Sequence, residues 1–159
     1  MYIAIEGIKG AGKSTIINML AEYLVNNNIN YTLVEPTKRI IGANIYEWVS
    51  EKLPVLRKIE KWNEILYRQR SNKAAKIALN FKGLKLGDRS IITSYVSRWN
   101  KWNNPDICIK RVDKYESRMP APDHIIYLDL TVEAAFERVN KRTDRNYGKQ
   151  DETFTKLFE

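Results

Sequence analysis

A parallel α/β sheet with helices on both faces is the fold class that this sequence predicts, and three stretches near its start carry the prediction. Residues 2–6 (YIAIE) are a short apolar run typical of a buried strand. Residues 15–25 (TIINMLAEYLV) place apolar side chains at helical spacing, and residues 29–35 (INYTLVE) are rich in β-branched residues and end at Pro36. A strand, a helix and a second strand in this order form a βαβ unit with parallel strands and a right-handed crossover.

Between the first strand and the helix lies a glycine-rich loop, residues 7–14 (GIKGAGKS), which matches the phosphate-binding pattern G-x-x-x-x-G-K-[ST]. Its glycines allow a sharp turn that brings backbone N–H groups onto phosphate oxygens. Lys13 is expected at the β- and γ-phosphates, the Ser14 hydroxyl at Mg²⁺, and the helix N-terminus faces the phosphates. The loop therefore predicts a nucleoside triphosphate site formed by Gly7, Lys9, Gly10, Ala11, Gly12, Lys13, Ser14 and Thr15.

The remaining elements follow from periodicity and from turn residues. The predicted elements are helices over 41–52, about 56–81, 95–102, 107–118 and 132–140, a third strand in the region 84–92 and a fourth over 124–130. Asp88 and Arg89 are expected at the carboxyl end of the third strand, and Thr131 as the N-cap of the last helix. The second face of the long helix is basic, which is typical of a solvated helix surface.

Composition narrows the class of protein. A length of 159 residues predicts one domain, and 43% hydrophobic with 29% charged residues is ordinary for a globular chain. No apolar run reaches the ~18 residues of a membrane span. The single Cys108 argues against a disulfide framework, so a reducing cytoplasm is expected. With a single His124 beside this one cysteine, a zinc site is not expected either. The net charge of +8 indicates a polyanionic partner or several phosphates, although solvated lysines account for part of it.

With these motifs in place, the chain resembles the thymidylate kinases, a family of P-loop nucleoside monophosphate kinases. Four stretches carry the resemblance, in the family's order, over about residues 1–146. They are 3–15 (IAIEGIKGAGKST); 34–37 (VEPT) with Ile41-Gly42; 66–70 followed by 87–90 (GDRS); and 122–129 (PDHIIYLD) followed by Arg138 and the arginine-rich residues 142–145. The resemblance implies a P-loop NTPase fold of three layers (αβα), with strand 2–6 central and an arginine-rich lid at about 140–150.

The resemblance also implies roles for individual residues, because phosphoryl transfer needs charge neutralised from several sides. Its implied cofactors are ATP and Mg²⁺, with Ser14 and Asp88 on the metal side. The implied catalytic residues are Lys13, Arg89, Asp88 and the lid residues Arg142 and Arg145. The implied acceptor-binding residues are Glu35, Lys38, Arg39, Leu66, Arg70, Arg89, Ser94 and Arg98, of which Arg70 would contact the base.

The acceptor side departs from the family's pattern at three positions. Lys9 stands where the family has an Asp that contacts the sugar, and Leu66 stands where it has a Phe that stacks on thymine, with Tyr67 as a possible substitute. Ser97-Arg98 replaces a Tyr-Gln pair. The family's last strand and helix, beside the adenine, have no counterpart before the sequence ends. Kinase chemistry is therefore predicted more firmly than thymidylate as the acceptor.

The resulting prediction is transfer of the ATP γ-phosphate to a deoxynucleoside monophosphate, with dTMP as first choice, by a cytoplasmic and possibly homodimeric protein. One alternative is a deoxynucleoside kinase, in which Glu35 would accept the proton of a 5′-hydroxyl. A second is a P-loop protein that binds nucleotide or nucleic acid without kinase activity, for which the basic helix, Trp99 and Trp102 are the candidate surface. Neither nucleic acid nor a membrane is expected as a partner.

Overall fold

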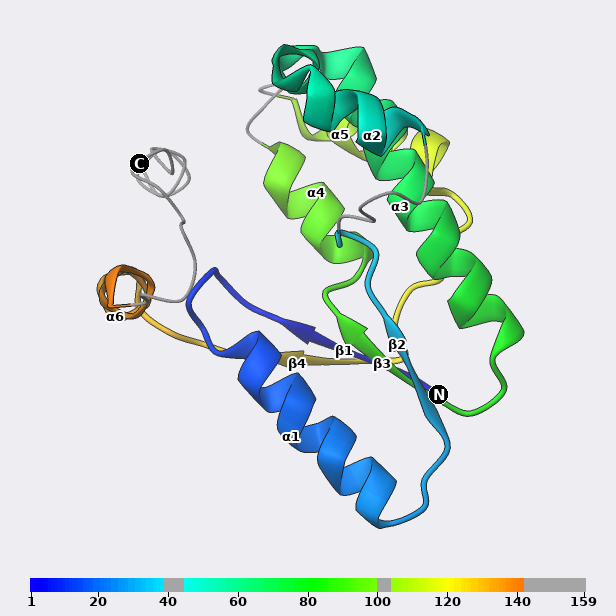
Figure 1. Cartoon of the computed structure of the whole chain (residues 1–159), viewed down its shortest axis with the longest axis vertical. Helices are drawn as coiled ribbons and strands as arrows, with labels where there is room; N and C mark the ends of the chain where they lie inside the picture. Colours follow the sequence, from blue (N-terminus) through cyan, green and yellow to red (C-terminus); the bar gives the residue numbers. More distant parts are fainter. Residues whose placement is uncertain (39–44, 100–103, 142–159) are drawn as a thin grey trace.

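A four-stranded parallel sheet forms the centre of the computed structural model, which describes residues 1–38, 45–99 and 104–141 (Figure 1). The strands are β1 (Tyr2–Glu6), β2 (Tyr31–Val34), β3 (Leu84–Asp88) and β4 (His124–Tyr127). Their order is β2-β3-β1-β4 and every pair is parallel, so β1 is flanked on both sides as predicted. Ile5 lies opposite Asp88 of β3 and Ile126 of β4, which brings three strand ends to one edge of the sheet.

Helices cover both faces of the sheet, which confirms the predicted three layers. One face carries α1 (Lys13–Asn26), and the other carries α3 (Glu60–Asn80), α4 (Ile91–Trp99) and α5 (Pro105–Glu116) (Figure 1). Two apolar clusters match these faces, because neighbouring strand residues point to opposite sides. One cluster contains Ile5, Ile17 and Leu86; the other contains Tyr2, Ala4, Val34, Ala74, Ala75, Ala78, Ile91, Cys108, Val112 and Met119.

The long helix predicted over about 56–81 is interrupted. The structure has α2 (Ile45–Lys52), a 3₁₀ turn η1 (Pro54–Lys58), and then α3, with Ile59 extended between them. Side chains hold this break: the Asn63 amide donates to the Arg57 carbonyl, and Arg57 Nε donates to the Ser50 carbonyl at 3.2 Å. Residues 41–44 of the predicted helix 41–52 lie outside the described residues.

Two helices begin earlier than predicted, and side-chain caps explain both differences. β3 ends at Asp88, which confirms the expected position of Asp88 at the carboxyl end of the strand, whereas α4 begins at Ile91 and the helix was predicted to begin at 95. Ser90 Oγ accepts a hydrogen bond from the Ile92 N–H at 3.2 Å, which starts α4. α5 begins at Pro105 because Asn104 Oδ1 accepts from the Ile107 N–H at 3.1 Å.

α6 (Val132–Asn140) begins as predicted after its N-cap Thr131, whose hydroxyl accepts from the Ala134 N–H at 3.3 Å.

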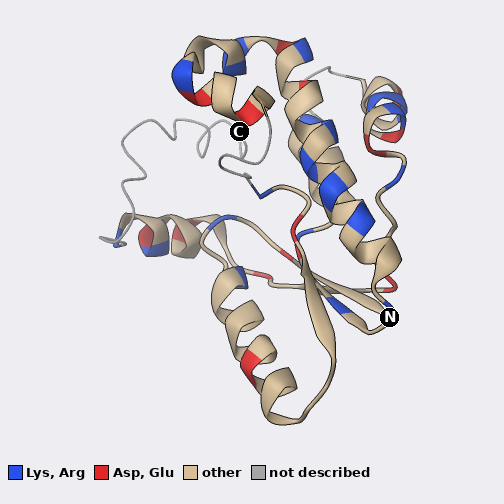
Figure 2. Cartoon of the chain, turned by 45° about the vertical axis from the view of Figure 1, so that its right-hand side comes forward, with Lys and Arg blue, Asp and Glu red and all other residues tan. Residues whose placement is uncertain are grey.

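Charge is distributed unevenly over the helices. Lys and Arg recur along α3, and the exposed ones are Lys61, Arg68, Lys73 and Lys76 (Figure 2). No helix among the described residues combines the length and the apolar character that a bilayer span requires.

Candidate active site

The phosphate-binding loop joins β1 to α1 and depends on glycine at three positions. Gly7, Gly10 and Gly12 have φ values of 141°, 91° and 94°, in the left-handed region that side chains disfavour. Gly10 also approaches α6 closely, since a Cβ there would lie 2.6 Å from the Ala135 carbonyl oxygen. A Cβ on Gly12 would meet nothing within 4 Å, so that side of the loop is open. Lys9 is half-buried on the same loop, and Ala11 is buried beneath it.

Lys13, the first residue of α1, lies folded back over the loop. Its side chain is 8% exposed, and Nζ donates to the carbonyl oxygens of Gly7 at 2.8 Å and Ile8 at 2.7 Å. The N-terminus of α1 has no side-chain cap and no acidic residue in its first turn, and Ser14 and Thr15 are exposed there. Free N–H groups, a lysine and an exposed hydroxyl are the groups that bind the phosphates and Mg²⁺ of a nucleotide, so these residues fit ATP.

Asp88, at the end of β3, lies among several charged groups predicted for the site. Burial raises the pKa of its carboxyl above the ordinary value, and the charge of Glu35 acts in the same direction. The positive charges of Arg89, Lys13 and Lys38 act in the opposite direction on the same pKa. The ends of β1, β2 and β3 thus bring together the donor lysine and the predicted acceptor residues Glu35 and Lys38, whose own ion pair measures 2.6 Å.

Within the described residues no group of three His, Cys, Asp or Glu could hold a metal ion alone. Mg²⁺ does not need such a cage, because it usually keeps several waters and binds one or two protein groups together with substrate phosphates. Ser14 and Asp88 supply one hydroxyl and one carboxylate of the required kind. The residues present therefore fit a nucleotide-bound Mg²⁺.

We expect Asp88→Asn to lower kcat at least ~10²-fold, the typical effect of removing a charge that acts on a transferring phosphoryl group. Thermal stability should respond in the opposite direction. Because the folded-state pKa is raised, the ionised carboxylate destabilises the fold above that pKa, and this cost disappears as pH falls through it. The melting temperature of ligand-free Asp88→Asn should therefore equal or exceed that of the wild type at pH 7, and the gap should close towards pH 4.

Calorimetric scans of both proteins across this pH range, beside ADP-release assays, test the prediction. A variant that melts lower at pH 7 and keeps full activity would show that Asp88 has a purely structural role.

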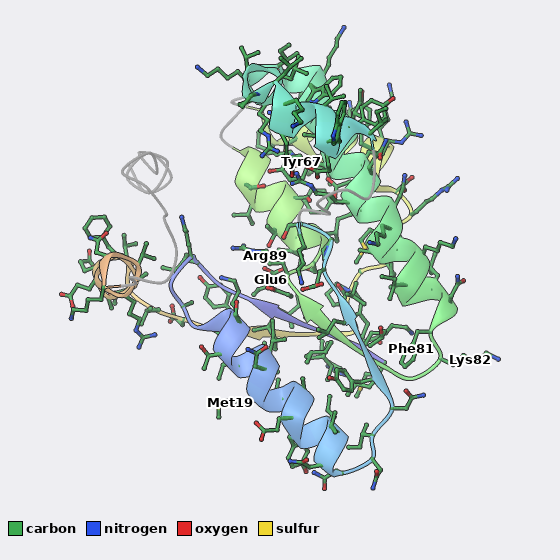
Figure 3. The ribbon with its side chains drawn as sticks, in the orientation of Figure 1. Glu6, Met19, Tyr67, Phe81, Lys82 and Arg89 are labelled. Carbon is green, nitrogen blue, oxygen red and sulfur yellow. The ribbon has the colours of Figure 1, made fainter. Side chains whose placement is uncertain are left out.

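Arg89 follows β3 in an unusual backbone conformation, with a left-handed φ of 71°. Its N–H donates to the Ile5 carbonyl at 3.2 Å, and the next residue is held by Glu6. Glu6 Oε1 accepts from both the N–H and the hydroxyl of Ser90 at 2.7 Å, and Oε2 accepts from the Thr93 hydroxyl at 2.7 Å. Figure 3 shows Glu6 and Arg89 together at this edge of the sheet. The end of β1 thus fixes the turn that presents Arg89.

The predicted acceptor residues on α3 and α4 are buried. Leu66 is 2% exposed, whereas its neighbour Tyr67 is only half-buried, so the accessible ring on this turn belongs to Tyr67. Arg70 pairs with Glu47 of α2, and Arg98 pairs with Glu116 of α5 at 2.8 Å. Ser94 donates to the other oxygen of Glu116 at 2.9 Å. Both guanidinium groups lie over the Tyr67 ring, with Cζ 5.6 Å and 4.3 Å from its centroid for Arg70 and Arg98.

Three predicted residues, Arg39, Arg142 and Arg145, lie outside the described residues, as does almost all of the lid expected at about 140–150, so their roles stay predictions. Sequence reasoning missed the three buried carboxylates that hold the site: Glu6, Glu47 and Glu116. The available signal for Glu6 was a charged residue at the end of an apolar strand, directly before the loop. Glu47 and Glu116 lie on amphipathic helices, where the sequence pattern predicts that an acidic side chain faces solvent.

The parallel sheet, the G-x-x-x-x-G-K-S loop at the end of its central strand and the cluster of charges at the same edge define a P-loop NTPase fold with a nucleotide site. A structural neighbour supports this fold: deoxyadenosine kinase from M. mycoides, solved with bound dATP, has a TM-score of 0.57 and 24% identity, over 89% of this chain and 72% of that one. At this identity the likeness concerns the fold.

Residues 5–159 match the thymidylate kinase family model, and the chain belongs to this family. The probable thymidylate kinase of Methanobrevibacter smithii is 30% identical over 152 residues, which cover 91% of this chain and 71% of that protein. The thymidylate kinase of Fervidobacterium nodosum is 28% identical over 152 residues, covering 91% and 75%. Family membership confirms the resemblance and the predicted enzyme class, an ATP-dependent nucleoside monophosphate kinase.

Proposed function

We propose that this protein transfers the γ-phosphate of ATP to a deoxynucleoside monophosphate, with dTMP as the preferred acceptor and Mg²⁺ as the cofactor. The family match over residues 5–159 is the observation that carries the proposal. The gathering of Lys13, Asp88 and Arg89 at one edge of the sheet supports it, because the reaction needs positive charge around the moving phosphoryl group.

Each residue has a distinct task in this reaction. Lys13 releases the loop carbonyls of Gly7 and Ile8 and donates to the β- and γ-phosphates, while the N–H groups of the loop and of the α1 N-terminus bind the phosphate oxygens. Arg89 and Lys38 bind the acceptor phosphate and orient it for in-line attack. Mg²⁺, when bound, neutralises charge on the donor phosphates. Ser14 and Asp88 are the residues that would hold it.

The test is a coupled ADP-release assay with ATP and Mg²⁺ across all common deoxynucleosides, nucleosides and their monophosphates. We expect the highest kcat/KM with dTMP and no ADP release above background with any nucleoside. A higher kcat/KM for another monophosphate would overturn the choice of thymine, and activity on nucleosides alone would overturn the reaction type.

A deoxynucleoside kinase is the second candidate, favoured by the position of Glu35 directly after β2 in the charge cluster of Asp88. A hydroxyl acceptor needs a base to take its proton, whereas a phosphate acceptor does not. Glu35→Gln discriminates between them: the proposed function expects less than a ~10-fold loss of kcat, and the second candidate expects a loss of ~10²–10⁴-fold. Glu22→Gln, at an exposed position of α1, is the matched control and should leave kcat unchanged.

We also propose that residues 1–159 form one kinase domain, that the protein is a homodimer and that it is cytoplasmic. The exposed apolar side chains of α2 and η1, among them Trp48 and Val55, offer a surface of the composition that subunit interfaces bury. Light scattering should give twice the mass of 18.6 kDa. Retention on DNA at ~200 mM salt, where nonspecific phosphate contacts weaken, would favour a nucleic-acid partner instead.

A further inference from the structure

The ring of Tyr67 lies against a buried positive charge. Arg98 Cζ is 4.3 Å from the ring centroid, well inside the ~6 Å range of cation–π contacts. The ring projects from α3, while Arg98 comes from α4, so the contact links two helices. Figure 3 places Tyr67 on the side of α3 that faces α4.

Arg98 is itself held from a third helix. Its Nη1 lies 2.8 Å from Glu116 Oε1 on α5, and Glu116 is only 1% exposed. The second carboxylate oxygen of Glu116 accepts the Ser94 hydroxyl at 2.9 Å. Both oxygens of Glu116 are therefore engaged by α4, one by Arg98 and one by Ser94, and the guanidinium has little freedom to move.

The second terminal nitrogen of Arg98 accounts for the contact of its guanidinium with the Tyr67 ring. Nη2 is buried and has no hydrogen-bond partner among the described residues. A buried N–H without a conventional acceptor is costly unless an electron-rich group faces it. The π-face of Tyr67 is such a group, and the central carbon of the guanidinium, Cζ, lies 4.3 Å from the ring centroid. The chain Glu116–Arg98–Tyr67 is thus a sequence of contacts from a buried carboxylate to a half-buried aromatic ring.

We propose that Arg98 and Glu116 are positioning residues of the acceptor site, which hold the Tyr67 ring as the surface on which the base of the acceptor nucleotide stacks. This inference rests on the proposed function and adds that Arg98 acts through Tyr67 and does not itself contact the nucleotide. Every nucleobase has a π-face, so this stacking contributes to acceptor affinity in general, and its loss affects all accepted bases alike.

The geometry supports action through the ring. Arg98 Nη2 and Glu116 are buried, so Tyr67 is the accessible member of this chain of contacts. Tyr67 is partly exposed, and Arg70, the residue predicted to contact the base, lies 5.6 Å from the same ring centroid. A base lying near Arg70 would therefore also be near Tyr67.

The experiment replaces both partners of the Arg98–Glu116 ion pair, so that no unpaired charge stays buried. Loss of a single partner would bury an uncompensated charge and could prevent folding, whereas replacement of both by apolar residues is often tolerated. In Arg98→Met/Glu116→Leu we expect the KM for dTMP to rise about tenfold, with kcat and the KM for ATP within about threefold of wild type. Stacking of a base on an aromatic ring typically has an effect of this size.

A second step separates positioning from direct contact. Tyr67→Leu should raise the KM for dTMP by a similar factor, Tyr67→Phe should leave it nearly unchanged, and the triple variant should show no further rise. Effects that multiply in the triple variant, to about a hundredfold, would show that Arg98 contacts the nucleotide independently, which overturns the proposal. An unchanged KM in the folded double variant would also overturn it.

Two measurements keep this test separate from the proposed function. Wild-type protein is first assayed with dTMP, so an inactive wild type contradicts the proposed function and not the role of Arg98. Binding of dTMP to each variant by calorimetry should show the same tenfold weakening as KM. Lys110→Gln, an exposed cation on α5, is the matched control and should leave KM, kcat and affinity unchanged.

Discussion

Lys13→Ala is expected to lower kcat at least ~10³-fold, the effect typical of a group that stabilises charge only in the transition state. Lys13 is the first residue of α1, and its ammonium donates to the carbonyl oxygens of Gly7 and Ile8 in the loop. We expect the alanine variant to fold, because Lys13 belongs to neither apolar cluster of the core. The KM for the acceptor should change much less than kcat.

ADP-release kinetics and a thermal melt of the same preparation test this expectation. Lys82→Ala is the control, because Lys82 is exposed and lies at the opposite end of the sheet from the loop (Figure 3). A folded Lys13→Ala protein with near-wild-type turnover would contradict the assignment of the loop as the donor site.

Glu6→Ala should have the largest effect on stability, lowering the free energy of unfolding by about 3–5 kcal/mol. The Glu6 side chain is 6% exposed and accepts three hydrogen bonds at 2.7 Å from Ser90 and Thr93. Alanine leaves these three donors without an acceptor, and each unsatisfied buried group costs ~1–3 kcal/mol. The negative charge also lies at the N-terminus of α4, where it favours the helix. Turnover should fall as well, because the Arg89 turn loses its support.

Urea denaturation measures the change in the free energy of unfolding. Thr93→Val is the matched control, because it removes one of the three donors and leaves the carboxylate in place, with an expected cost of about 1 kcal/mol. If Glu6→Ala and Thr93→Val cost the same, the carboxylate does not organise this turn as proposed.

The donor side of the site was predictable because its residues are contiguous. A run of eight residues, 7–14, specifies the turn, the lysine and the hydroxyl, and the apolar run before it and the amphipathic run after it specify the strand and the helix. All of these interactions are local in the chain, so the pattern of residues is enough to predict them. The N-cap Thr131 was predicted correctly on similar grounds, whereas the central position of β1 was predicted correctly from the family resemblance.

Element boundaries were less predictable where a side chain from another part of the chain decided them. The start of α4 depends on Ser90, and Ser90 is held by Glu6, 84 residues earlier. The break at Ile59 depends on contacts of Arg57 with Ser50 and Asn63 that periodicity cannot reveal. In both places apolar spacing continued across the boundary, and hydrogen bonds overrode it.

The sequence by itself determined that this protein has a phosphate-binding loop on a parallel sheet, and its ordered motifs were sufficient to find the family. Only the tertiary structure decided which charges are buried and which partners neutralise them. Glu47 and Glu116 meet Arg70 and Arg98 across helix interfaces, and these pairs place both arginines over Tyr67. The physical reason is that burial of a charge requires a partner in space, and helix packing supplies that partner from a distant part of the chain.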